Sequence, residues 1–480
     1  MMRYMNIKII GLYLHMKEKC GVFGVYSCEA YEKCLVDVIR GLRLLQHRGQ
    51  EGCGIAFHTN DSGLVLEKGN GLVDEVFDHH YDTSISTNKC IGHVRYSTSG
   101  SSKLDEEQKY NECQPLIGNC KLGIFYLLHN GNIPNIEEEH DTQYIIRFIE
   151  ESKCDNWREI LIALMDTIPC AYCLLIITAD EMFAVRDRFG IRPLCIGQFS
   201  SNGVYCVSSE SCALQHFQLV RDVKPGEIIR INQEGLETLY QAGNSQLRIC
   251  SFEYLYFQNP TSICEGRLVS DVRSDLGKLL AQKEDIVYAG SSDDLSSFLV
   301  VGVPKTGIIA AKSYAEMLRV EYKQVITKNK NIGRTFIAPS NDERQVLCRK
   351  KFAFDETEIK NKNIIIVDDT IVRGNVMKSI VSNMWQCGAS QIHIRIPAPP
   401  VINICRLGID IPSCEELLAY GKTIEQIKDE LGVSSIRYLT CDDLDTVLPS
   451  TCYKEYFCEE LDNHILYVAA PKFMQRQHAA

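Results

Sequence analysis

The residues Ile364-Ile365-Ile366-Val367-Asp368-Asp369-Thr370-Ile371-Val372-Arg373-Gly374 set the architecture of the second half of the chain. A run of β-branched residues is typical of a buried parallel strand, and ligands bind where such strands end. Two carboxylates there suit ribose hydroxyls or hydrated Mg²⁺. The following turn points N–H groups at an anion, ahead of a helix predicted for residues 377–385. The alternative is an ordinary strand followed by a capped helix.

Around this stretch the sequence alternates helices and strands in the rhythm of a parallel sheet with crossovers. Helices are predicted for 269–282, 313–318 and 377–386, and strands for 299–303, 364–367 and 392–396. Residues 20–249 instead alternate short apolar strands with turns, with two helices predicted for 31–45 and 142–151. That pattern predicts stacked antiparallel sheets flanked by helices. The change falls near Cys250, so the expected domains are 20–249 and 250–480.

Composition excludes several classes of protein. A chain of 480 residues should hold two or three domains, and a hydrophobic content of 45% with 24% charged residues is ordinary for a globular protein. The net charge of −11 argues against a nucleic-acid or anionic-membrane partner. No apolar run approaches the roughly 18 residues that span a bilayer.

The N-terminus and the cysteines bear on processing and location. Residues 1–19 are mildly apolar but carry Lys8 and no small-x-small cleavage pattern, so we expect a leader or propeptide, with Met16 an alternative start. The 22 cysteines are scattered through apolar runs of a long chain, unlike those of a secreted disulfide scaffold. This favours free thiols and a cytoplasmic location.

Four segments of the first half occur in a telling order: Cys20-Gly21-Val22-Phe23-Gly24, then Leu45-Gln46-His47-Arg48-Gly49-Gln50-Glu51, then Gly92-His93-Val94-Arg95-Tyr96-Ser97-Thr98, then His129-Asn130-Gly131-Asn132. Together they resemble the class II glutamine amidotransferase domain. That domain is an N-terminal-nucleophile hydrolase with an αββα sandwich, and the resemblance covers residues 20–249.

The resemblance implies a role for each of these positions. Cys20 would attack the glutamine side-chain amide, with its own α-amine as base once residues 1–19 are removed. Asn130 and Gly131 would donate to the oxyanion. The remaining glutamine contacts would come from Arg95 to the α-carboxylate, from Asp141 to the α-ammonium, and from Thr98. Gln143 stands where the family usually has Glu.

Each residue also has a plainer interpretation. Asn130-Gly131 alone is most often a hairpin turn, and Arg95 could form a surface ion pair. His47 is expected to be structural, because this class of nucleophile needs no histidine.

The second half carries further segments with a family resemblance. These are Phe252-Glu253-Tyr254-Leu255-Tyr256-Phe257, Val303-Pro304-Lys305-Thr306-Gly307 and Lys328-Asn329-Lys330-Asn331-Ile332-Gly333-Arg334-Thr335-Phe336-Ile337. With residues 364–374 they resemble a type I phosphoribosyltransferase domain. Both halves in this order resemble the amidophosphoribosyltransferase family, which makes 5-phosphoribosylamine from phosphoribosyl pyrophosphate (PRPP) and glutamine.

The resemblance implies a PRPP site and a Mg²⁺ ion. Lys328 and Arg334 would face the leaving pyrophosphate. Asp368 and Asp369 would hold the ribose hydroxyls and the metal, with the Thr306 hydroxyl nearby. The turn Thr370 to Asn375, with Arg373 and Gly374, would hold the 5′-phosphate.

Three positions depart from the family pattern. Asn375-Val376 replaces a Thr-Thr pair, so one hydroxyl for the phosphate is lost. Lys330 replaces an arginine, and Lys305 stands where an acid is usual. These changes put the affinity for PRPP in question.

One branch of the family holds a [4Fe-4S] cluster on four cysteines, two of them in a late Cys-x-x-Cys. Cys250 and Cys405 match the first two positions, whereas the late pair is replaced by Cys452 and Cys458, six apart. A cluster needs four thiolates or substitutes. The alternative is four thiols left over from a cluster-bearing ancestor.

The leading hypothesis is an amidophosphoribosyltransferase that hydrolyses glutamine and passes ammonia to PRPP, the first step of de novo purine biosynthesis. The alternatives are a diverged PRPP- or nucleotide-binding regulatory homologue with little or no transferase activity, and a glutamine-dependent transferase with another acceptor. The family implies a homodimer or homotetramer, and purine nucleotides are possible inhibitors.

Overall fold

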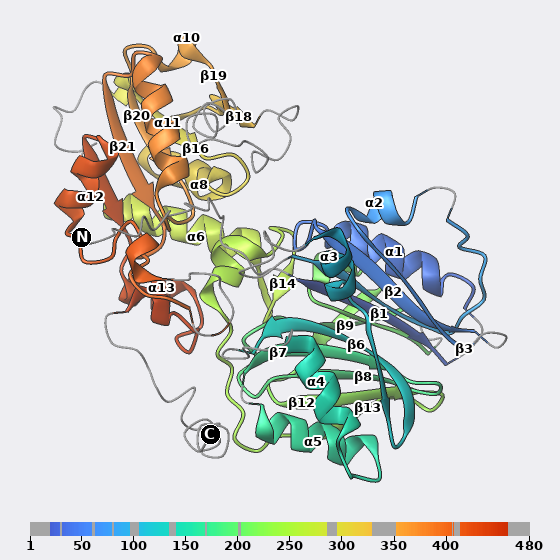
Figure 1. Ribbon diagram of the computed structural model, residues 1–480. Helices are drawn as coiled ribbons and strands as arrows, with labels where there is room; N and C mark the ends of the chain where they lie inside the picture. The colour runs from blue at the N-terminus through green and yellow to red at the C-terminus, as the bar shows by residue number, and fades with distance from the viewer. Residues whose placement is uncertain are drawn as a thin grey trace, which may run out of the picture.

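The computed structural model describes residues 20–28, 31–59, 63–78, 81–96, 105–133, 141–168, 170–199, 203–285, 295–328, 352–405, 407 and 413–458. Two antiparallel sheets form the first half and a parallel sheet forms the second (Figure 1). The predicted fold class is therefore confirmed.

The first sheet has seven strands in the order β11-β9-β10-β1-β4-β2-β3. Its core against helix α1 (Cys34–Leu44) is apolar and fully buried. The strands are β1 (Gly21–Ser27), β2 (Gly52–Thr59), β3 (Gly63–Asn70), β4 (Lys89–Arg95), β9 (Cys195–Phe199), β10 (Val204–Ser208) and β11 (Gln218–Asp222).

The second sheet has six strands in the order β13-β12-β8-β7-β6-β5 and packs against helices α4 (Asp141–Glu150) and α5 (Trp157–Thr167). A separate apolar core joins the two sheets, which gives the four-layer αββα sandwich. The strands are β5 (Leu116–Cys120), β6 (Gly123–Asn132), β7 (Ala171–Ile177), β8 (Met182–Arg186), β12 (Glu227–Asn232) and β13 (Gly235–Gln241).

The second half holds a five-stranded sheet in the order β17-β16-β20-β21-β22, all of whose pairings are parallel. The strands are β16 (Phe298–Gly302), β17 (Glu321–Tyr322), β20 (Asn363–Val367), β21 (Gln391–Ile396) and β22 (Ser435–Tyr438). The helices of this half are α6 (Val269–Gln282), α8 (Ile308–Leu318), α10 (Glu356–Ile359), α11 (Asn375–Gln386), α12 (Ile424–Leu431) and α13 (Cys441–Val447). Strands β18 (Ile326–Lys328) and β19 (Phe352–Phe354) form a separate ribbon.

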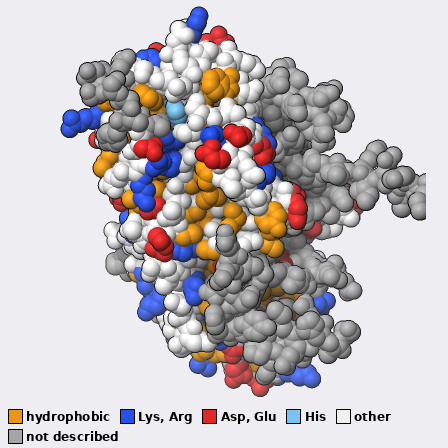
Figure 2. Space-filling view, turned by 90° about the vertical axis from the view of Figure 1, so that its left-hand side faces the viewer, with side chains coloured by type: hydrophobic (Ala, Val, Ile, Leu, Met, Phe, Trp, Pro, Cys, Tyr) orange, Lys and Arg blue, Asp and Glu red, His pale blue; other side chains and the backbone are white. Residues whose placement is uncertain are grey.

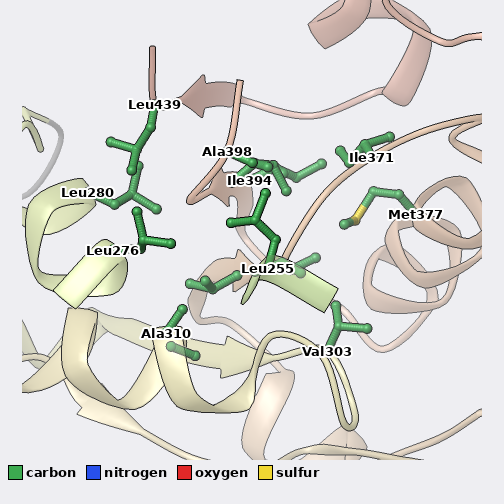
Figure 3. Packing of buried hydrophobic residues seen from close by; sticks show 14 of the residues in the cluster. Leu255, Leu276, Leu280, Val303, Ala310, Ile371, Met377, Ile394, Ala398 and Leu439 are labelled. Carbon is green, nitrogen blue, oxygen red and sulfur yellow. The ribbon is translucent and has the colours of Figure 1, made fainter. Parts of the chain in front are cut away.

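The single turn of π-helix Glu253–Phe257 joins the two halves. Figure 3 shows Leu255 of this turn among the side chains of the hydrophobic core of the second half, close to Ile394 of β21. The turn is thus anchored in the second half of the chain by an apolar side chain. Its first residue, Glu253, faces the other half, as described below.

The predicted helices and strands of the second half are confirmed, with α8 beginning five residues before its predicted start. The prediction of only two helices in the first half was wrong, because α5 is a full helix and the short helices α2 (Val73–Val76) and α3 (Glu106–Glu112) also form. Helix α5 buries Ile160, Leu161 and Leu164 at helical spacing.

No helix among the described residues is long and apolar enough to cross a membrane. On the face shown in Figure 2, acidic and basic side chains are interspersed rather than separated by sign. That face therefore presents no basic stripe of the kind that tracks a nucleic-acid backbone.

The buried ring of His393 on β21 gives the fold a pH dependence. Burial, with the nearby Arg395 guanidinium, lowers the pKa of His393 from 6.5 to about 4. Between pH 4 and pH 6.5, His393 is protonated in the unfolded chain and neutral in the folded chain. The contribution of His393 to the free energy of unfolding is therefore fully present above pH 6.5. It is lost as the pH falls towards 4, and the loss amounts to about 3 kcal/mol at 1.36 kcal/mol per pKa unit.

Urea unfolding between pH 7.5 and 5 measures this effect. We expect the free energy of unfolding of the unmodified chain to fall across this window, and that of His393→Gln to stay flatter. Parallel curves for the two chains would contradict the assignment to His393.

Candidate active sites

Cys20 lies half-buried at the start of β1, beside the end of β4. The two strands pair with Gly21 opposite Val94, so this register brings Cys20 next to the residues after Val94. The Cys20 thiol donates to the Tyr96 carbonyl at 3.6 Å, and its own carbonyl accepts from Arg48 Nε at 3.0 Å. The backbone of the predicted nucleophile is therefore fixed by a buried side chain.

Asn130 and Gly131 reach the same place from the other sheet. Asn130 Nδ2 donates to Ser209 Oγ at 3.3 Å, and the N–H of Val22 donates to the same oxygen at 2.9 Å. Ser209 thus joins the predicted oxyanion donor to the strand that carries Cys20. No local signal in the sequence pointed to Ser209, because its partners lie 79 and 187 residues away.

The hairpin interpretation of Asn130-Gly131 is wrong. Both residues lie inside β6 and pair with Cys173 and Tyr172 of β7. A Cβ at Gly131 would lie 2.1 Å from the Ala171 carbonyl oxygen, so the close approach of the strands requires glycine.

Arg95 and Asp141 were predicted to bind the α-carboxylate and the α-ammonium of glutamine. The Arg95 side chain is only 4% exposed, so it is not a surface residue, although it does form an ion pair with Glu112. Its Nη1 is buried and has no hydrogen-bond partner among the described residues. Asp141 Oδ2 lies 3.5 Å from His129 Nδ1. Thr98 lies outside the described residues.

Arg48 is the centre of a buried charge cluster, which we call the Arg48 cluster: Arg48, Glu210, Glu253 and Arg192. Arg48 donates to Glu210 at 2.6 Å and to both oxygens of Glu253 at 3.0 Å. Arg192 lies 3.5 Å from Glu253. All three side chains of Arg48, Glu210 and Glu253 are fully buried, so the cluster joins the Cys20 strand to the second half.

The pKa shifts of Arg48 and Glu210 favour the charged form of each. Burial lowers the pKa of Arg48, but the carboxylates of Glu253 and Glu210 outweigh this and hold it above the ordinary value. Burial likewise raises the pKa of Glu210, and Arg48 and His47 outweigh it and hold it well below the usual range. His47 Nε2 donates to the Glu210 carboxylate at 2.8 Å, in keeping with its predicted structural role.

The predicted PRPP acids lie at the carboxyl end of the parallel sheet. Gly302 of β16 pairs with Val367 of β20, and the Thr306 hydroxyl donates to Asp368 Oδ1 at 2.6 Å. Thr370 donates to Asp369 Oδ2 at 3.2 Å. Burial and the neighbouring Asp369 raise the pKa of Asp368 well above its usual range. A divalent cation would offset this crowded negative charge, so the residues fit Mg²⁺.

The turn after the acids has the conformation of an anion-binding loop. Gly374 has a φ of +79° and caps α11, whose first residue is Asn375, so the first N–H groups of the helix face the turn. Arg373 donates from Nε to Glu416 at 2.6 Å, with its side chain 9% exposed. The arginine is therefore held by Glu416 beside the turn.

The predicted cations are only partly described. Lys328 ends β18, and burial followed by the charge of Lys305 lowers its pKa. The two lysines therefore lie close enough to repel each other. Lys305 is exposed and has a φ of +76°. Arg334 and Lys330 lie outside the described residues.

Tyr256 lies between the two sites. Burial raises its pKa, and Asp369, Tyr96 and Asp368 add to the rise in that order, so its hydroxyl is near both the Cys20 side and the PRPP acids. Arg273 donates to the carbonyls of Tyr254 and Gln258, each at 2.8 Å. Sequence reasoning did not assign either residue to a site.

Among the four candidate cluster cysteines, Cys458 lies apart from the other three, and a tyrosine hydroxyl occupies the space beside Cys250. Cys250 Sγ lies 3.4 Å from the Tyr456 hydroxyl, and Cys458 Sγ lies 3.9 Å from Cys441 Sγ. Within the described part of the chain, no three His, Cys, Asp or Glu side chains are placed to share a metal ion. These thiols as arranged do not fit a [4Fe-4S] cluster.

Models of two domain families match the chain. One is the glutamine amidotransferase domain, over residues 102–216, and the other the phosphoribosyl transferase domain, over residues 272–398. Fold, sites and these matches define a protein that joins a glutamine amidotransferase domain to a phosphoribosyltransferase domain.

Amidophosphoribosyltransferases resemble the chain over nearly its whole length. The Bacillus subtilis (strain 168) protein is 34% identical over 446 residues, covering 89% of this chain and 89% of that protein. The Pyrococcus horikoshii protein is 38% identical over 441 residues, covering 88% and 92%. The chain belongs to the amidophosphoribosyltransferase family and is an enzyme of this type, acting in the first step of purine biosynthesis.

Solved structures agree with this assignment. That of glutamine PRPP amidotransferase from B. subtilis complexed with ADP and GMP has a TM-score of 0.81 and 32% sequence identity, covering 92% of this chain and 97% of that one. The match extends through both domains. Nothing in it favours the diverged, regulatory alternative.

Removing Arg48 tests the charge cluster. Arg48→Leu leaves the Glu210 and Glu253 carboxylates buried without their main partner, so we expect a loss of about 3–5 kcal/mol in the free energy of unfolding. Urea unfolding at pH 7 measures it.

The matched control is Arg43→Leu, because the Arg43–Asp74 pair is 40% and 75% exposed. An exposed pair contributes about 0–1 kcal/mol. Equal losses for the two variants would show that the Arg48 cluster is not a buried electrostatic anchor.

Proposed function

We propose that Cys20 hydrolyses glutamine and that the ammonia attacks C1 of PRPP at the end of the parallel sheet, giving 5-phosphoribosylamine, glutamate and pyrophosphate. The observation that carries this proposal is the connection of both sites through one short segment. Residues 252–257 hold Glu253 against the support of Cys20 and Tyr256 near Asp369. The domain limits proposed are 20–249 and 250–480.

In the glutaminase half, removal of residues 1–19 would make the α-amine of Cys20 the base nearest its thiol. The thiol attacks the amide carbon, and Asn130 Nδ2 with the Gly131 N–H stabilises the oxyanion. The buried Nη1 of Arg95 is available to bind the α-carboxylate, and Asp141 pairs with the α-ammonium. Thr98 completes the proposed contacts.

In the transferase half, Asp368, Asp369 and the Thr306 hydroxyl would hold Mg²⁺ and the ribose. When bound, Mg²⁺ neutralises charge on the departing pyrophosphate. The turn from Thr370 to Asn375 binds the 5′-phosphate mainly by backbone N–H groups, so the loss of a hydroxyl at Val376 is tolerated. Lys328 and Arg334 supply positive charge near the pyrophosphate.

Other features of the enzyme follow from its relatives. The B. subtilis structure complexed with ADP and GMP supports the binding of purine nucleotides by this chain, and we propose that they act as inhibitors. A homodimer or homotetramer is proposed on the same family resemblance. A cytoplasmic location is proposed because the described cysteines are all free thiols.

The central test is glutamate release from glutamine with Mg²⁺, with and without PRPP. We expect release that PRPP stimulates and that Cys20→Ala abolishes, with Cys28→Ala as the matched control because Cys28 lies at the far end of β1. Mass spectrometry establishes whether Cys20 is the first residue.

Release that is indifferent to PRPP would mean that the second half lacks its substrate. No release from a chain that begins at Cys20 would overturn the glutaminase assignment.

Lys305 gives a test of the PRPP site that is specific to this chain. Its charge lowers the pKa of Lys328, and the neighbouring Thr306 donates to Asp368 at 2.6 Å. Lys305→Met removes this charge without introducing the acid usual in the family, so one attraction for the pyrophosphate is lost. We expect the KM for PRPP to rise about tenfold, equivalent to about 1.4 kcal/mol.

The KM for glutamine should not change, and Lys360→Met, which alters an exposed lysine after α10, should leave both constants unchanged. A KM for PRPP that is unchanged or lower in Lys305→Met would exclude Lys305 from the pyrophosphate site.

A further inference from the structure

The Tyr456 hydroxyl lies in a fully buried polar group at the junction of the two halves, which we call the Tyr456 junction: Tyr456 with Cys250, Ser251, Phe252 and Tyr453. The hydroxyl lies 2.6 Å from Ser251 Oγ and 3.4 Å from Cys250 Sγ. It accepts from the Phe252 N–H at 3.2 Å and donates to the Tyr453 carbonyl at 3.2 Å. No exposed surface remains on this tyrosine.

The phenol stands among the thiols that a cluster would use. Burial raises the pKa of Tyr456, and Cys250 and, more weakly, Cys405 add to the rise, so both sulfurs lie near the hydroxyl. Cys452 in turn lies near Cys250. An iron–sulfur cube bound by these thiolates would need the volume that the ring and its hydrogen bonds fill.

The fourth ligand position is also different. In a Cys-x-x-Cys pair that begins at Cys452, the second cysteine would be residue 455, which is Glu455 in this chain. Glu455 is buried and accepts from the Tyr453 hydroxyl at 3.3 Å. Cys458 lies beside Cys441 instead.

We propose that the Tyr456 junction replaces the iron–sulfur cluster of one branch of the family, and that this chain binds no such cluster. Like a cluster bound by the same cysteines, the junction would hold the C-terminal segment against residues 250–252. Ser251 also donates its N–H to the Tyr453 carbonyl at 3.0 Å, and the rings of Phe252 and Tyr456 lie 4.5 Å apart. Glu253, the partner of Arg48, follows directly.

Tyr456 is therefore a positioning residue. It holds the start of the π-helical turn, the turn holds Glu253, and Glu253 holds the arginine that binds the Cys20 carbonyl. If a cluster held these residues, their positions would depend on iron and on the absence of oxygen. The hydrogen bonds of the Tyr456 phenol hold them without either requirement.

Iron analysis tests the absence of the cluster. The full-length chain, produced in iron-rich medium and purified without oxygen, is treated with ferrous iron, sulfide and thiol reductant, then desalted. We expect far less than one iron per chain, no iron–sulfur absorption band, and PRPP-dependent glutamate release that is the same in air. About four iron and four sulfide per chain, with a band that bleaches in air, would overturn the proposal.

A pair of tyrosine variants tests the junction itself, independently of activity. Tyr456→Phe removes a hydroxyl with several partners, so we expect the Tm to fall by roughly 2–4 °C. Tyr438→Phe is the matched control, since the buried Tyr438 hydroxyl has no hydrogen-bond partner among the described residues, and its Tm should not fall. Equal shifts, or no shift in Tyr456→Phe, would overturn the proposed role of Tyr456.

Discussion

The buried guanidinium of Arg48 is the constraint on which the rest of the structure depends. A charge without access to water is tolerated only where opposite charges and hydrogen bonds surround it. Here Glu210 and Glu253 supply them from opposite halves of the chain, and Arg192 balances the second carboxylate. A further donor, Nε, binds the Cys20 carbonyl. The position of the nucleophile and the docking of the two halves are thus set by one side chain.

This arrangement explains why residues 252–257 carry such a distinctive sequence. Glu253 must reach Arg48, and Leu255 must fill the hydrophobic core of the second half. Tyr256 must also lie near Asp369 and Tyr96. A π-helical turn lets side chains of close neighbours point to these separate places, and such turns are frequent at functional sites. The Tyr456 junction fixes the residues just before it.

Much of the fold and of the site could be predicted from the sequence, since the signals are local. The strand and acids of residues 364–369 and the period of α6 lie within single segments, and the ordered motifs of the first half predicted the antiparallel sandwich. Ser209 and the Arg48–Glu253 pair could not be predicted, because they join segments 79 to 205 residues apart that are paired only by the folded sheets. The interpretation of Asn130-Gly131 as a turn failed because tertiary pairing overrode a local preference.

The division of the Arg48 cluster between the two halves also bears on how such enzymes recombine. A glutaminase half taken alone would retain Arg48 and Glu210 but lose Glu253, and a foreign partner would have to offer a carboxylate at the same depth. The interface therefore accepts only a partner that places a carboxylate against the buried Arg48 guanidinium. A glutaminase half moved to another protein would keep the support of Cys20 only if the segment that follows Cys250 moved with it.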